Sequence, residues 1–190
     1  MQPEELALRS LPAGVAGTGR TGAWFESMFR EHYPRVVALL TRLTGDRGQA
    51  EEIAADAFAK LARRPVFLQT PEEQTAWVYR VATNAGLDAL RANARRRRTE
   101  EAASAERLRA GKESGALEEM LREERRTRVR GVLAGLKPRE AQLLLLRASG
   151  LAYREIAQTL GMQAGSVGTL LARAEREFER RYRARHGDDV

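Results

Sequence analysis

A short stretch from Tyr153 to Arg176 leaves few folds open to this chain, because its small, glycine and branched apolar residues have a characteristic spacing. Ala157, Gly161 and Val167 lie four and then six residues apart. This pattern predicts a helix-turn-helix, with a small residue where two helices touch, a glycine in the turn and a branched side chain that docks the second helix. A plain helical hairpin with a solvated arginine face is the alternative.

The helix expected after Gly161 has two chemically different faces. Val167 lies at the centre of an apolar face that also carries Leu170, Leu171, Ala174 and Phe178. Hydroxyl and arginine side chains occupy the opposite face, as in helices that enter a major groove. The candidate DNA-binding residues here are Gln163, Ser166, Thr169, Arg173 and Arg176.

The composition suits a polyanionic partner. The 190 residues carry a formal net charge of +7, and only Lys60, Lys112 and Lys137 among the 33 basic residues are lysines. The chain contains no cysteine, which excludes disulfides, thiolate zinc sites and iron–sulfur clusters. No apolar run is long enough to cross a membrane, and the amino terminus lacks a signal-peptide segment. We therefore expect a cytoplasmic protein with no membrane insertion, no metal and no cofactor.

Helix signals recur along the chain, and no segment alternates with a strand period. A first helix is predicted over residues 24–44, ending at Gly45. Asp46 can cap a second helix that ends before Pro65. Residues 70–73, Thr-Pro-Glu-Glu, form a capping box for a third helix that reaches about Arg97. The fold class expected is all-α.

Charge divides the chain into parts. Residues 23–98 hold 13 basic and 9 acidic residues, and residues 120–190 hold 15 and 9, whereas residues 99–119 hold three and six. We expect two small helical domains joined by a flexible acidic linker, the second domain being the helix-turn-helix. The predicted boundaries are a flexible arm over 1–22, a first domain over 23–98, a linker over 99–121 and a second domain over 122–185.

The predicted third helix carries a second group of candidate functional residues. Arg80, Asn84, Asp88 and Arg91 form a polar stripe with Trp77 at its upstream end, and four arginines follow at 95–98. An aromatic ring beside such a stripe can stack on an unpaired base, an asparagine amide can read a base edge, and the arginines can hold phosphates. Alternatively, Trp77 belongs to the core and the stripe is a set of ion pairs.

Four motifs in order give the chain a resemblance to bacterial extracytoplasmic-function (ECF) sigma factors. Residues 25–34, Phe-Glu-Ser-Met-Phe-Arg-Glu-His-Tyr-Pro, resemble the opening of that family's first domain. Residues 50–58, Ala-Glu-Glu-Ile-Ala-Ala-Asp-Ala-Phe, resemble its polymerase-binding helix. Residues 76–84 with 87–91 resemble its promoter-melting, −10 reading helix, and residues 136–140 with 151–173 resemble its −35 reading domain.

The resemblance implies a specificity subunit of RNA polymerase without catalysis of its own. Its partners are then core RNA polymerase, promoter DNA and an anti-sigma factor. It implies polymerase contacts at Glu51, Glu52 and Asp56, and −35 reading by the last helix. It implies −10 binding and melting by residues of the third helix, namely Trp77, Arg80, Asn84, Arg91, Arg95 and Arg96. The resemblance also implies that the loop before that helix, residues 67–70, forms much of the pocket for a flipped base.

The sequence departs from the family pattern at three places. Ala55 stands where members usually carry a glutamine, which removes one polar polymerase contact. Gly168 and Leu170 stand where the recognition helix usually has basic residues. Two other functions fit the residues: a helix-turn-helix regulator that does not engage polymerase, and a degenerate sigma-like interaction module. The separation of His32 from His186 and the lack of thiols and of a glycine-rich phosphate loop argue against an enzyme.

Overall fold

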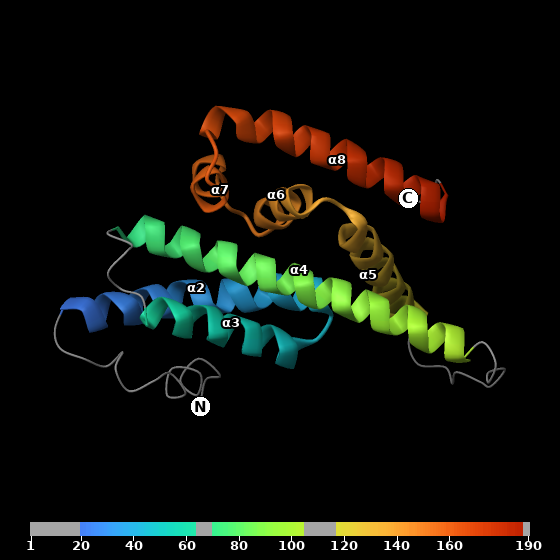
Figure 1. Cartoon of the computed structure of the whole chain (residues 1–190), viewed down its shortest axis with the longest axis horizontal. Helices are drawn as coiled ribbons and strands as arrows, with labels where there is room; N and C mark the ends of the chain where they lie inside the picture. The colour runs from blue at the N-terminus through green and yellow to red at the C-terminus, as the bar shows by residue number, and fades with distance from the viewer. Residues whose placement is uncertain (1–19, 64–69, 105–116, 188–190) are drawn as a thin grey trace.

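The computed structural model describes residues 20–63, 70–104 and 117–187, and all regular structure within them is helical (Figure 1). The all-α fold class is therefore confirmed. The helices run in this order: α2 (Arg20–Thr44), α3 (Arg47–Ala62), α4 (Pro71–Ser104), α5 (Leu117–Gly135), α6 (Pro138–Ala148), α7 (Tyr153–Leu160) and α8 (Ala164–His186).

The starts of α3 and α4 predicted from the sequence are confirmed by their hydrogen bonds. The Asp46 carboxylate accepts a hydrogen bond from the Gln49 backbone N–H at 3.0 Å and so caps α3. At the start of α4, the Glu73 backbone N–H donates to Thr70 Oγ1 and the Thr70 N–H donates to Glu73 Oε2, each at 3.2 Å. This reciprocal pair is the predicted capping box.

Two helix ends lie further out than predicted. α2 begins at Arg20, inside the arm expected over residues 1–22, and α4 continues past Arg97 to Ser104. The linker expected over 99–121 is thus helical at both described ends, since α5 begins at Leu117; residues 105–116 lie outside the described residues, as do 1–19. The extension of α4 has a simple cause: no glycine or proline interrupts its arginine-, alanine- and glutamate-rich sequence after Gly86.

Helices α2, α3 and α4 pack around an aromatic centre. Phe29, on α2, lies with its ring 4.6 Å from that of Tyr33 and 5.0 Å from that of Phe58 on α3. Phe29, Phe58 and, on α4, Val78 are almost completely buried. Large buried rings of this kind contribute much of the stability of a small helical domain.

The helix-turn-helix is confirmed. Gly161 ends α7 in the left-handed conformation (φ 61°, ψ 50°), and the Met162 N–H donates to the Ala157 carbonyl at 2.9 Å. Ala157 and Val167 are both buried, as the spacing required. A glycine is favoured at this turn because a side chain in that conformation is strained.

The second half of the chain, α5 to α8, packs directly on the first half, α2 to α4. α7 lies against α4, and α5 and α6 also contact it (Figure 1). One hydrophobic cluster includes buried residues of both halves, for example Phe29 and Val78 with Leu146 and Ile156. A second joins Leu43, Leu87 and Leu90 to apolar residues of α5 and α6, namely Leu133, Leu136, Ala141 and Leu145. The sequence predicted two helical domains held apart by a flexible linker. In the structure the two domains pack against each other and share these hydrophobic clusters.

At Gly86, α4 packs against leucines of α2 with no room for a side chain. A Cβ atom at Gly86 would lie 2.6 Å from Leu40 Cδ2 and 2.8 Å from Leu43 Cδ2, and both leucines are fully buried. We expect Gly86→Ala to lower the free energy of unfolding, since overpacking costs about 1–3 kcal/mol and the gain in helix propensity offsets only about 1 kcal/mol. Urea unfolding measures this difference. Gly165→Ala, at a position with open space, is the control, and equal stabilisation of both variants would contradict the expected clash.

Candidate nucleic-acid and polymerase interfaces

The outer face of α8 presents the residues predicted to read DNA. Thr169, Arg173 and Arg176 are exposed on this helix, and Ser166 is half-buried near its start. Gln163, the residue before the helix, is also exposed. These five side chains therefore occupy one accessible region at the amino-terminal half of α8, where backbone N–H groups also favour phosphate.

Further along α8, the arginines are tied to carboxylates. Arg180 donates two hydrogen bonds to Glu177, at 2.9 and 2.8 Å, and Arg181 donates a third at 2.5 Å. Hydrogen bonds from Arg180 and Arg181 lower the pKa of Glu177 to about 2, so this carboxylate is ionised at neutral pH. The positive charge at Arg180 is therefore partly compensated, whereas no ion pair is found for Arg173 or Arg176 within the described residues.

The two departures in the recognition helix lie in different surroundings. Gly168 is half-buried, and a Cβ atom there would meet only Tyr153 Cε2, at the ordinary contact distance of 3.5 Å. Tyr153 is itself 44% exposed, with the Arg147 guanidinium 5.5 Å from its ring centroid. Leu170 is half-buried and packs against the shared hydrophobic cluster.

These surroundings predict opposite effects of added charge. We expect Gly168→Lys to tighten duplex binding for all sequences and to increase the salt slope by about one, because it adds one phosphate contact. Leu170→Arg should leave binding unchanged or weaken it, because it places a charge at a packed edge. Fluorescence anisotropy against salt concentration measures both variants. Tighter binding by Leu170→Arg with no effect of Gly168→Lys would reverse the assignment of the two faces.

Only part of the polar stripe on α4 is accessible to solvent. Arg80 and Asn84 are exposed, and Trp77 is half-buried with part of its side chain packed on the core cluster. Trp77 thus combines features of the two interpretations offered by the sequence, an anchored ring with an accessible portion. Arg91 is half-buried and lies 4.0 Å from Asp88.

The second half of the chain covers the downstream part of this stripe. Gln142 Nε2, on α6, donates a hydrogen bond of 2.5 Å to Asn84 Oδ1. Arg91 donates to the carbonyl oxygens of Ala134 and Leu136 at the end of α5, at 3.4 and 3.3 Å. Two residues predicted to contact promoter DNA are therefore occupied by contacts within the protein.

Gln142 was not identified from the sequence as a partner of Asn84. The sequence nevertheless contains one sign that another part of the chain covers the polar stripe. Leu87 lies seven residues after Arg80 and four before Arg91, so the helical period places it on the polar stripe itself. Leu87 is 1% exposed and packs with residues of α5 and α6. A large apolar residue within a polar face indicates that something covers that face.

The four arginines at positions 95–98 follow the polar stripe on α4. Arg95 and Arg96 are exposed near the downstream end of α4, and the Arg96 guanidinium donates a hydrogen bond to the Asn93 side chain. Asn93 in turn donates to Gln49 of α3 at 3.0 Å. Of the loop expected to form the base pocket, residues 67–69 lie outside the described residues, and Thr70 is exposed at the α4 cap.

The predicted polymerase contacts share one helix, α3. Glu52 and Asp56 are exposed one turn apart, and Glu51 is half-buried. Asp56 forms an ion pair with Lys60 at 2.6 Å, and Glu51 forms one with Arg47 at 2.8 Å. For Glu52, the part of the chain that the structure describes offers no ion pair, so its carboxylate is available to an outside cation.

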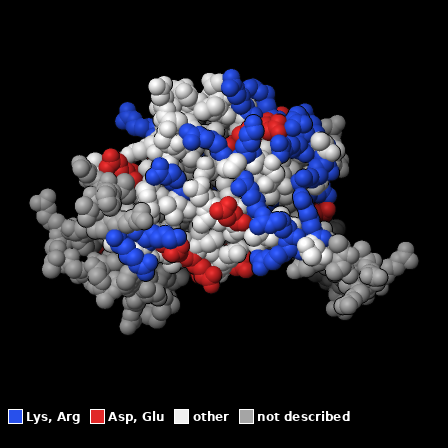
Figure 2. Space-filling model, in the orientation of Figure 1, with Lys and Arg blue, Asp and Glu red and all other residues white. Residues whose placement is uncertain are grey.

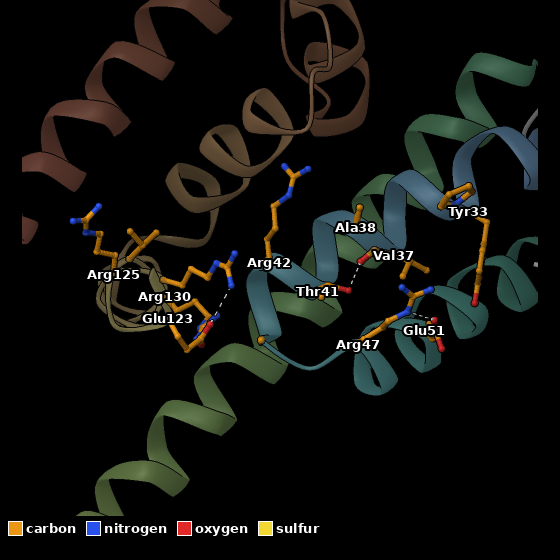
Figure 3. Close-up of a pocket in the computed structure, with 14 residues that line it drawn as sticks. Tyr33, Val37, Ala38, Thr41, Arg42, Arg47, Glu51, Glu123, Arg125 and Arg130 are labelled. Atoms are coloured by element: carbon orange, nitrogen blue, oxygen red, sulfur yellow. Dashed lines mark hydrogen bonds and ion pairs between the residues drawn. The ribbon is translucent and has the colours of Figure 1, made fainter. Parts of the chain in front are cut away.

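A hollow of about 890 Å³ lies between α2, the start of α3 and α5 (Figure 3). The Arg47–Glu51 pair lies on one wall, and Glu123 and Arg130 lie on the other, where a hydrogen bond from Arg130 lowers the pKa of Glu123. Arg130 is buried against Gly45, with its guanidinium carbon 3.0 Å from the position of an added Cβ atom. Part of the predicted docking region therefore borders the second half of the chain.

Comparisons with known proteins also divide the chain into two regions, one in each half. Residues 28–96 match the family model described as Sigma-70 region 2, and residues 126–178 match the one described as Sigma-70, region 4. The chain is 30% identical over 187 residues to "ECF RNA polymerase sigma factor SigE" of Mycolicibacterium smegmatis. This match covers 94% of this chain and 71% of that protein. The chain belongs to the ECF family of RNA polymerase sigma factors. The predicted family is confirmed.

Another ECF relative is shorter in its match. "Probable ECF RNA polymerase sigma factor SigI" of Mycobacterium tuberculosis is 32% identical over 154 residues, or 79% of this chain. This ECF sigma factor spans about half of that relative, 52% of its length. None of its helices, within the described residues, is both long enough and apolar enough to cross a membrane.

Proposed function

We propose that this ECF sigma factor docks on core RNA polymerase through α3, reads the −35 duplex with α8 and opens the −10 element with α4. It directs initiation without catalysing a reaction itself. The observation that carries the proposal is the order of three chemically distinct surfaces on one fold: an acidic helix, an aromatic and basic helix, and the outer face of a helix-turn-helix. They fall within the two matched sigma regions.

Electrostatics supports a separate role for each surface. The exposed carboxylates of α3 suit a basic polymerase surface, where complementary charge accelerates association. Arg173 and Arg176 on α8, which form no ion pair with the residues that the structure describes, suit the phosphates and guanine edges of a duplex. On α4, Trp77 and Asn84 suit an unstacked base, because stacking and amide hydrogen bonds repay the few kcal/mol that base flipping costs.

The packing of the two halves requires a change of arrangement during function. Asn84 Oδ1 and the Arg91 guanidinium are not free to contact DNA while they are bonded to Gln142 and the end of α5. The arrangement described above is therefore the resting form, and polymerase binding separates the halves. Cytoplasmic localisation and control by an anti-sigma factor remain predictions from the family and complete the proposed role.

Transcription in vitro tests the function directly. Purified protein and core polymerase are incubated with a promoter library of random sequence, and the transcribed templates are sequenced. The proposal expects transcripts from templates that share two motifs at a fixed spacing. DNA binding without any polymerase-dependent transcript would instead establish a helix-turn-helix regulator, and the absence of both would establish an interaction module.

Promoter opening should depend on the stripe of α4. We expect Trp77→Ala and Asn84→Ala to reduce open complexes more than closed complexes, because the lost stacking costs about 1–3 kcal/mol only when a base is flipped. Permanganate footprinting and gel shift measure the two steps separately. Circular dichroism controls for Trp77, whose ring is partly packed in the core. If Trp77→Ala merely unfolds the protein, its role is structural.

A further inference from the structure

Basic residues of both halves meet around a groove that the proposed function does not use. The groove has a volume of about 590 Å³ and lies between the end of α4, the middle of α5 and the end of α8. In Figure 2, Lys and Arg atoms crowd the side of the molecule where these segments lie. The basic side chains that line the groove are Arg97, Arg98, Arg128, Arg130, Arg185 and His186, and Glu124 is its one acidic lining residue among those described.

The partners of these side chains leave positive charge uncompensated. Arg128 pairs with Glu124 at 2.6 Å, and Arg130 pairs with Glu123. Among the described residues, Arg185 donates to one neutral group, the Gly131 carbonyl, at 2.8 Å. For Arg97 and Arg98, both exposed, the described residues supply neither a hydrogen bond nor an ion pair. Three guanidinium groups, those of Arg97, Arg98 and Arg185, thus face one space without an ion pair to any residue that the structure describes.

His186 adds an unsatisfied polar atom at the same place. It lines the groove, and its Nε2 atom is shielded from solvent without a hydrogen-bond partner among the described residues. A buried nitrogen without a partner is unfavourable, and a bound acceptor would satisfy it. Phosphate oxygens are acceptors that also pair with guanidinium groups in bidentate fashion.

The geometry points to a binding site for a chain of phosphate groups, such as a polyphosphate or a short run of nucleic-acid backbone, held between the two halves. The volume falls within the range of small-molecule sites. Six of the thirteen lining residues are basic, and they come from α4, α5 and α8, so this lining favours phosphate groups. Because the walls come from both halves, the bound anion holds the resting arrangement together.

Matched arginine pairs make the site testable. Arg98→Gln and Arg185→Gln each remove a groove arginine, one from each wall. Arg125→Gln on α5 and Arg183→Gln on α8 remove the same charge from helices that line the groove but at exposed positions outside it, since neither residue lines it. Arg98 has no intramolecular bond within the described residues, so its loss leaves the fold intact. Circular dichroism verifies this for all four variants.

Calorimetric titration of the full chain with inorganic tripolyphosphate, at about 150 mM salt, measures the affinity. Both groove variants should lose about tenfold in affinity, as expected for a lost charge-assisted hydrogen bond, and both controls should change less than twofold. A single-stranded oligonucleotide of equal charge forms the second arm, and the ligand that shows the groove pattern identifies the source of the phosphates. Equal losses in all four variants, or no saturable binding of either ligand, would overturn the site.

Discussion

Reversing two charges on α3, Glu52→Lys with Asp56→Lys, should strongly weaken the binding of core RNA polymerase while the protein stays folded. Both side chains are exposed on one face, whereas Ala54, Ala57 and Phe58 on the other face are buried. Rim charges mainly set the association rate. Each reversal replaces an attraction with a repulsion, so we expect a loss in affinity of at least about 100-fold, or about 2.7 kcal/mol. Surface plasmon resonance with immobilised core enzyme measures it.

The matched control reverses two exposed glutamates elsewhere, Glu175→Lys with Glu179→Lys on α8. This variant has the same net charge and should bind polymerase with less than a threefold change. Because Asp56 is already paired with Lys60, Glu52→Lys alone should account for most of the loss. Unaltered polymerase binding by the α3 variant, with a native circular dichroism spectrum, would remove α3 from the interface and favour the regulator that acts without polymerase.

Locking the two halves together should eliminate promoter opening. Arg42, on α2, donates a hydrogen bond of 3.3 Å to the Ala148 carbonyl at the end of α6, and both residues are exposed. The natural chain has no cysteine, so Arg42→Cys with Ala148→Cys introduces a unique pair for a short bis-maleimide linker. In the linked protein Gln142 and α5 cannot leave Asn84 and Arg91, and we expect a loss of open complexes of more than about 100-fold.

The same double variant capped with a monofunctional maleimide is the control, because it carries the same substitutions without the link. It should form open complexes at a rate near that of the natural protein. Single-cysteine variants treated with the bis-maleimide exclude modification as the cause. Normal initiation by the linked protein would mean that the resting arrangement persists on the promoter, and the need for separation would then be wrong.

Local signals in the sequence predicted the local structure well. Asp46, Thr70 and Gly161 act through hydrogen bonds or dihedral angles within a few residues, so the helix starts and the turn could be predicted without knowledge of tertiary contacts. The ends of α4 and α5 could not, because a charged, alanine-rich segment suits both a solvated helix and a linker. Composition alone does not distinguish these two states.

The candidate site was predicted less completely, and the reason lies in long-range contacts. Residues on α8 face solvent, so their accessibility followed from the helical period. The surroundings of Asn84 depend on Gln142, fifty-eight positions away, and no local pattern encodes such a pair. Leu87 was the available clue, as an apolar side chain within a polar stripe that needed a cover. Arg130 was missed because a buried arginine is uncommon and depends on the nearby Glu123.

If polymerase binding separates the two halves, as proposed, the shared hydrophobic clusters also set the polymerase concentration at which this protein responds. Because both halves belong to one chain, each meets the other at a high effective concentration, so even a weak interface stays closed most of the time. A form that is open only about 1% of the time binds its partner with an apparent Kd about 100-fold weaker than the open form alone. Under the proposed function, residues such as Leu87 and Leu146, which are buried in the clusters shared by the two halves, therefore tune the threshold concentration at which initiation begins.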